Sequence, residues 1–147
     1  MRFQHSIIKD DIVNEFWDCI FVFKEYPGSM DIIFKNEYGK DITVHLAENM
    51  TVYFDRWHEV YSLCDDEYER LLWDVRDIVR NNAYAVSVTV GDHLYISCLM
   101  RGEMNSAEDF INDDPAEHSG LYRTGAVIEC VYYDNSRYKK FIIEKES

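Results

Sequence analysis

Apolar residues recur every three or four positions between residues 65 and 79, whereas most other positions there are charged. Side chains at this spacing lie on one face of a helix, so we expect an amphipathic helix with one buried face. Asp65 is a suitable N-cap, and Asn81 and Asn82 tolerate the left-handed backbone that ends many helices. The helix lies within the stretch from Glu48 to Met100, around which we expect the fold to be organised. Its apolar face consists of Tyr68, Leu71, Leu72, Val75, Ile78 and Val79.

Between residues 19 and 54, apolar and polar side chains alternate, which is typical of β-strands packed on one face. Short loops interrupt the alternation at residues 26–29, 37–39 and 47–49, and loop length determines which residues face each other across a hairpin. Gly39 and Asn49 end two of these loops and suit a left-handed backbone. We therefore expect a four-stranded antiparallel meander. Its pairs include Phe23 with Ile32, Phe21 with Phe34, Phe34 with Ile42, Ile32 with Val44, Val44 with Val52 and Ile42 with Phe54.

Two further hairpins are expected after the helix. The first reverses around residues 91–93, and we expect the three-residue loop that places Val88 opposite Ile96. The alternative is a two-residue turn, which places Val88 opposite Tyr95 and mixes the two faces of the sheet. The second hairpin reverses at an Asn135-Ser136 turn, with Cys130 opposite Phe141 and Ile128 opposite Ile143.

The segment between these hairpins, residues 101–120, has no periodicity and is rich in carboxylates. We expect a long acidic loop there, with one helical turn near residues 107–112. At the start of the chain, the spacing of Ile8, Ile12 and Phe16 predicts a short helix, with Asp10 or Asp11 as its cap.

These elements predict an α+β fold in one domain, residues 1–147, which is an ordinary domain length. A bent antiparallel sheet, made of a four-stranded meander and two hairpins, would carry one main helix packed on one face.

The chain contains 28 acidic and 15 basic residues, which gives a formal net charge of −13. This negative field repels phosphate and attracts basic protein surfaces, so we expect a basic protein partner and no direct nucleic-acid binding.

No apolar run has the length of a membrane span, and the start of the chain lacks the uncharged core of a signal peptide, so we expect no membrane contact and a cytoplasmic protein. The four cysteines include no Cys-x-x-Cys pair and predict mostly buried, reduced thiols.

His45, Asp55 and His58 are the candidates for a chemical site. For them to hold a metal ion or small ligand their side chains would have to converge, which requires a β-bulge near Arg56. Without the bulge, Asp55 and Trp57 share the outer face of the sheet with the preceding aromatic residue, and His58 lies on the other face. The sequence contains no phosphate loop, nucleophile elbow or zinc-protease motif, so we expect neither an enzyme nor a bound cofactor. A small-ligand or metal-binding domain, or an enzyme, centred on the three residues is the alternative hypothesis.

Carboxylates and aromatic residues also flank the main helix in the sequence. Aromatic side chains surrounded by negative charge are typical of a surface that binds a basic protein. Tyr61, Tyr95, Tyr132 and Tyr133 are expected to contribute to an aromatic face. The expected partner-binding residues are Tyr53, Trp57, Glu67, Asp74, Glu108, Asp109, Asp113 and Asp114.

A short motif occupies the middle third of the chain: Met50-Thr51-Val52-Tyr53-Phe54-Asp55-Arg56-Trp57-His58, then the acidic helix, then Ala85-Val86-Ser87-Val88 before a Gly-Asp hairpin. This arrangement resembles small bacterial proteins grouped with polymorphic-toxin immunity proteins, although Val60 stands where such relatives would carry a second His. The resemblance implies a non-enzymatic inhibitor that binds and neutralises a basic toxin or nuclease domain. A virus-encoded inhibitor that imitates nucleic acid and blocks a host defence nuclease is a second hypothesis.

Overall fold

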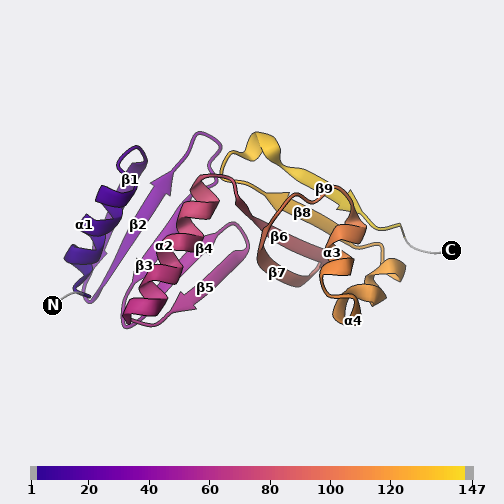
Figure 1. The fold of residues 1–147 in the computed structure, drawn as a ribbon, viewed down its shortest axis with the longest axis horizontal. Coiled ribbons are helices and arrows are strands. Elements are labelled where there is room, and N and C mark those ends of the chain that lie inside the picture. Colours follow the sequence, from indigo (N-terminus) through magenta and orange to yellow (C-terminus); the bar gives the residue numbers. More distant parts are fainter. Residues whose placement is uncertain (1–2, 145–147) are drawn as a thin grey trace.

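The protein consists of two antiparallel β-sheets and four α-helices. The structure is a computed structural model, and it describes residues 3–144 apart from the side chains of Tyr122 and Arg123. The sheets lie side by side, the N-terminal one with α1 and α2 and the C-terminal one with α3 and α4 (Figure 1). The expected α+β class, with a main helix packed on one face of a sheet, is confirmed. No helix in the described part of the chain combines the length and hydrophobicity of a membrane span.

The N-terminal sheet, called sheet A, is a meander in which each strand pairs with the next. The register predicted from the three loop lengths is confirmed, since Phe23 faces Ile32, Ile32 faces Val44 and Val44 faces Val52. Gly39 has the expected left-handed backbone, whereas the same expectation for Asn49 is wrong. The strands are β1 (Ile20–Tyr26), β2 (Ser29–Lys35), β3 (Ile42–Leu46), β4 (Met50–Phe54) and β5 (Trp57–Tyr61).

Sheet A has five strands rather than four, because the chain reverses in a two-residue turn that begins at Asp55. Asp55 adopts a left-handed backbone with φ 53°, which a short polar side chain tolerates. Tyr53 then faces His58 and Phe54 faces Trp57 across the turn. The expected sharing of the outer face by Tyr53 and Trp57 is therefore wrong, and Trp57 lies on the core face.

Helices α1 (His5–Glu15) and α2 (Asp65–Val79) accompany sheet A (Figure 1). Their apolar faces and the inner face of the sheet form one core, which includes Ile8, Ile12, Ile32, Phe34, Val44, Val52, Phe54, Leu71, Val75 and Ile78. The carbonyls of Gln4 and Cys64 accept the first hydrogen bonds of the two helices. The aspartates expected as N-caps therefore lie inside the helices instead: Asp10 and Asp11 in α1, and Asp65 at the first position of α2.

The C-terminal sheet, called sheet B, has the strand order β7-β6-β8-β9. Val88 faces Ile96, as predicted. The expected three-residue loop is wrong, because Val90 pairs with His93 and leaves a two-residue turn; a bulge directly after Val88 then shifts the register and restores the apolar pairing. The strands are β6 (Ala83–Val90), β7 (His93–Arg101), β8 (Val127–Val131) and β9 (Lys139–Ile142).

The register predicted for the last hairpin is wrong, because Cys130 faces Lys139 and not Phe141. The side chain of Asp134 accepts hydrogen bonds from the backbone N and the hydroxyl of Ser136. These bonds stabilise a turn that begins one residue earlier than expected, so every pair in the hairpin shifts by two positions.

Residues 101–120 form a helical unit rather than a long loop. The expected helical turn near residues 107–112 is part of α3 (Ala107–Asp113), which is followed by α4 (Pro115–His118) and the 3₁₀-helix η1 (Ser119–Arg123). The unit covers one face of sheet B, while Ala83, Ala85 and Val131 on the other face join the core of sheet A. The second core includes Tyr84, Val86, Val88, Met104, Phe110, Ile111, Leu121, Ile128 and Tyr132.

Asn81 ends α2 in a left-handed conformation with φ 62°, and its Oδ1 accepts a hydrogen bond from the backbone N of Asp134 at 2.7 Å. We expect Asn81→Ala to lower the free energy of unfolding by about 2 kcal/mol, because it loses the hydrogen bond and strains the backbone. Asn81→Gly should cost about half as much, since glycine accepts the backbone conformation. Urea unfolding of both variants tests this, and equal losses would contradict the strain component.

Candidate functional site

The three residues proposed for a chemical site do not converge. His45 lies on β3 with its Nδ1 2.6 Å from Oδ1 of Asp31, and Asp55 lies in the turn after β4. His58 stacks on Tyr53 at 5.7 Å and is separated from His45 by strand β4. Within residues 3–144, no group of three or more His, Cys, Asp or Glu side chains could hold a metal ion. All four cysteines are free.

The six aromatic residues expected on one face are divided between the two cores and the surface. Trp57 is 6% exposed and Tyr61 is fully buried, so neither is available to a partner. The two most exposed residues lie on different sheets, Tyr53 in sheet A and Tyr95 in sheet B. Tyr132 is buried and Tyr133 is half-buried, whereas Tyr53 and Tyr95 are each 46% exposed.

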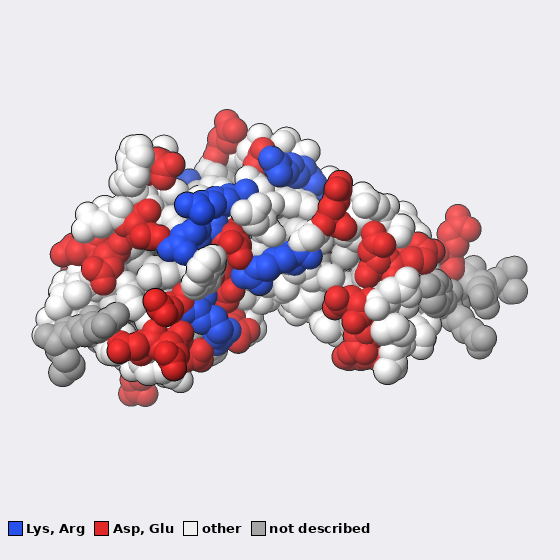
Figure 2. All heavy atoms as spheres, in the orientation of Figure 1, with Lys and Arg blue, Asp and Glu red and all other residues white. Residues whose placement is uncertain are grey.

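The expected partner-binding carboxylates of α2 take part in ion pairs within the protein. Glu67 accepts a hydrogen bond from Nε of Arg70 at 2.7 Å, and this contact lowers the pKa of Glu67. Asp74 accepts from the Tyr61 hydroxyl at 2.6 Å and from Nη2 of Arg101 at 2.7 Å. Basic and acidic side chains accordingly alternate over α2 in Figure 2. These two carboxylates therefore hold the fold together, and their charge is largely compensated.

A second group of carboxylates lies on the segment 103–117, which contains six acidic residues and no lysine or arginine. Figure 2 shows acidic side chains gathered over α3 and α4 without basic side chains among them. Asp109 accepts from the backbone N of Asn105 and Ser106, and Asp114 accepts from the backbone N of Glu117, so both stabilise helix starts. The four carboxylates without such a role are exposed: Glu103, Glu108, Asp113 and Glu117.

One exposed side chain of β7 lies next to this acidic segment. The Tyr95 hydroxyl donates to the backbone O of Glu117 at 3.3 Å, and its ring centroid lies 6.3 Å from that of His118 in an edge-to-face arrangement. Leu94, its neighbour in the chain, is 49% exposed but pairs with Thr89 and borders a separate hollow with Arg56 and Glu129. We call Tyr95 and the carboxylates of residues 103–117 the acidic patch. The sequence identified Tyr95 as aromatic surface.

The structure therefore separates the expected docking residues into three groups. Glu108, Asp109, Asp113 and Asp114 lie together in the acidic patch, whereas Glu67 and Asp74 are ion-paired on α2, and Tyr53 and Trp57 lie on opposite faces of sheet A. In comparisons with known proteins, no family model, no curated protein and no solved structure matches this chain.

Proposed function

We propose that this chain is a non-enzymatic binding protein that docks a basic protein partner on the acidic patch. The observation that carries the proposal is the uncompensated charge of residues 103–117. Among the described side chains, the one cation within 4.0 Å of these carboxylates is Lys139, whose Nζ lies 3.4 Å from Oε1 of Glu103. The other carboxylates of the segment keep their charge facing solvent, where it attracts a cationic surface.

An exposed aromatic side chain supplies the second element that a protein-binding site needs. Charge mainly accelerates the encounter, whereas aromatic and aliphatic side chains that a partner buries provide most of the affinity. Tyr95 is 46% exposed beside the carboxylates and can be covered by a partner without rearrangement of the sheet. Inhibition of a toxin or nuclease domain is the form of this function that the resemblance to immunity proteins implies.

Reversal of three charges in the patch tests this proposal. We expect Glu108→Lys/Asp113→Lys/Glu117→Lys to slow association with the partner by about tenfold at low salt and to reduce its salt dependence. The three positions are exposed, and none of their side chains caps a helix, so the fold should persist. The partner is first captured from the source cell on the wild-type chain, and association rates are then measured at two ionic strengths.

A matched control carries the same change of charge elsewhere. Glu25→Lys/Glu37→Lys/Glu48→Lys alters three exposed carboxylates at the loops of sheet A, far along the chain from the patch. We expect it to retain most of the wild-type association rate. Equal slowing in both triple variants would show that net charge and not the patch is responsible, and a captured partner with an acidic surface would contradict the proposal outright.

A further inference from the structure

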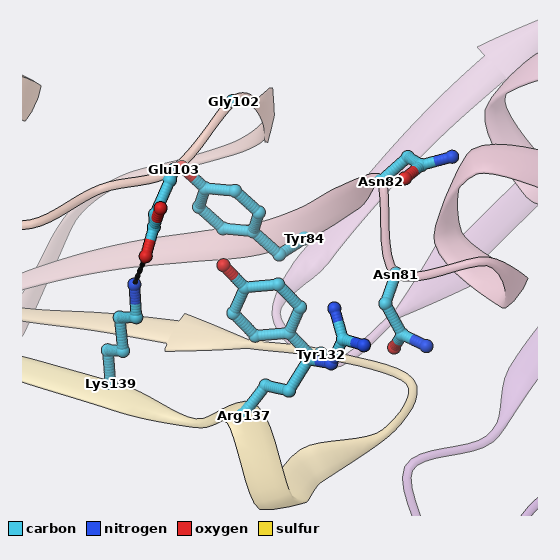
Figure 3. Close-up of a pocket in the computed structure, with 8 residues that line it drawn as sticks. All are labelled: Asn81, Asn82, Tyr84, Gly102, Glu103, Tyr132, Arg137 and Lys139. Carbon is cyan, nitrogen blue, oxygen red and sulfur yellow. Dashed lines mark hydrogen bonds and ion pairs between the residues drawn. The ribbon is translucent and has the colours of Figure 1, made fainter.

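A pocket of about 490 Å³ opens between the end of α2 and sheet B, and Glu103 is the one carboxylate of the segment 103–117 that lines it. Residues from four separate parts of the chain line it (Figure 3). They are the turn at Asn81 and Asn82, strand β6, the loop after β7, and the last hairpin.

Two buried tyrosines form the inner wall of this pocket. Tyr84 is 2% exposed and Tyr132 is 6% exposed, and their rings stack at 4.7 Å. Both hydroxyls point in the same direction, toward the pair of Glu103 and Lys139 (Figure 3). In the described part of the protein, no hydrogen bond reaches either hydroxyl, and neither oxygen is among the buried polar atoms without a partner, so both hydroxyls are open to the pocket. Burial raises the pKa of both phenols, so each keeps a proton that it can donate.

Two basic side chains border the same space. Nζ of Lys139 donates to the backbone O of Met104 at 2.9 Å, in addition to its contact with Glu103. The guanidinium of Arg137 lies 3.9 Å from the carboxylate of Asp134, beyond hydrogen-bond distance. Each of the two cations thus has a carboxylate within 4.0 Å, and of these two carboxylates Glu103 lines the pocket whereas Asp134 does not.

We propose that this pocket binds the phosphate group of a small molecule, a role separate from protein docking. Two phenols, a guanidinium and an ammonium group are all donors suited to an oxyanion. They come from different segments: in the view of Figure 3 the two hydroxyls and the Lys139 ammonium lie on one side of the tyrosine pair, and the Arg137 guanidinium lies on the other, near Asn81. A tetrahedral phosphate accepts hydrogen bonds from many directions, whereas a planar carboxylate prefers donors near its plane. The stacked tyrosines add an apolar wall for the remainder of a phosphate ester.

Titration of the ¹⁵N-labelled full chain at constant ionic strength tests the pocket. We expect inorganic phosphate and phenyl phosphate to shift the resonances of Asn81, Asn82 and Gly102 saturably, and sodium acetate to bind at least about tenfold more weakly. Tighter binding of phenyl phosphate would identify an ester as the ligand class, and tighter binding of inorganic phosphate would identify the free anion. Absence of saturable shifts with both phosphates, or equal affinity for acetate, would overturn the proposal.

Variants assign the binding to the pocket. Arg137→Gln alters an exposed side chain and should weaken phosphate binding by about tenfold. Tyr84→Phe and Tyr132→Phe keep the stacked rings and should each weaken it about threefold or more. Lys140→Gln is the matched control, since this exposed lysine follows Lys139 in β9 but does not line the pocket, and its effect should stay below about twofold. Wild-type affinity in Arg137→Gln and both tyrosine variants would refute the assignment.

Discussion

Replacing Asp74 by alanine is expected to lower the free energy of unfolding by roughly 2–3 kcal/mol, a large share of the stability of a domain this size. The two carboxylate oxygens of Asp74 serve two partners on different elements. Oδ2 accepts from the hydroxyl of Tyr61 on β5, and Oδ1 accepts from Arg101 on β7. The side chain is only 14% exposed, so water replaces these partners poorly when the carboxylate is removed.

The buried phenol accounts for most of this expected loss. Tyr61 is fully buried, its ring lies 4.3 Å from the guanidinium of Arg70, and burial followed by the bond to Asp74 keeps its pKa far above the ordinary value. In Asp74→Ala the hydroxyl remains buried and loses its acceptor. Tyr61→Phe removes the hydroxyl itself, so it should cost only about 1 kcal/mol, and adding Asp74→Ala to it should cost less than Asp74→Ala does alone.

Urea unfolding of the two single variants and the double variant measures this coupling. Glu69→Ala on the same helix is the control, because Glu69 is exposed, and its effect should stay within about 0.5 kcal/mol. Additive losses in the double variant would show that Tyr61 and Asp74 do not depend on each other.

Local features of the sequence were sufficient to predict most of sheet A. Loop length and the alternation of apolar residues act over a few positions, so the register of Phe23, Ile32, Val44 and Val52 followed from them. Strand β5 was missed because its turn begins with Asp55, which adopts a left-handed backbone without the glycine that usually marks such turns. A single unrecognised turn reversed the face assigned to every later residue of that strand.

In the candidate site, the sequence could not predict contacts between residues that lie far apart in the chain. From the sequence, Asp74 is expected to be an unpaired carboxylate on the exposed face of a helix. Its partner Arg101 lies 27 positions away, in β7. Ion pairs of this kind depend on tertiary packing, so the sequence could not distinguish paired from unpaired carboxylates. The segment 103–117 was different, because it contains no basic residue that could neutralise it locally. The unpaired hydroxyls of Tyr84 and Tyr132 likewise became visible only once β6 and β8 were paired.

Raising the pH from 8 to 11 is expected to lower the free energy of unfolding by roughly 4 kcal/mol through two thiols of sheet B. Burial raises the pKa of Cys98 and of Cys130 to about 11, from an ordinary value of 9.0. Above pH 9 the unfolded chain releases these protons while the folded protein retains them. Unfolding is therefore favoured as the pH rises toward 11, whereas the contribution is fully present below pH 9.

Comparison of variants isolates the thiols from other groups that titrate in this range. Cys98→Ala/Cys130→Ala should be less stable than wild type at pH 8, because it leaves space in the second core, but its stability should fall less steeply up to pH 11. Cys64→Ala removes an exposed thiol and should follow the wild-type profile. Unfolding by urea at a series of pH values gives the slopes directly. If the double variant and wild type lose stability in parallel, the buried thiols do not cause the alkaline loss, and the tyrosines of the two cores become its source.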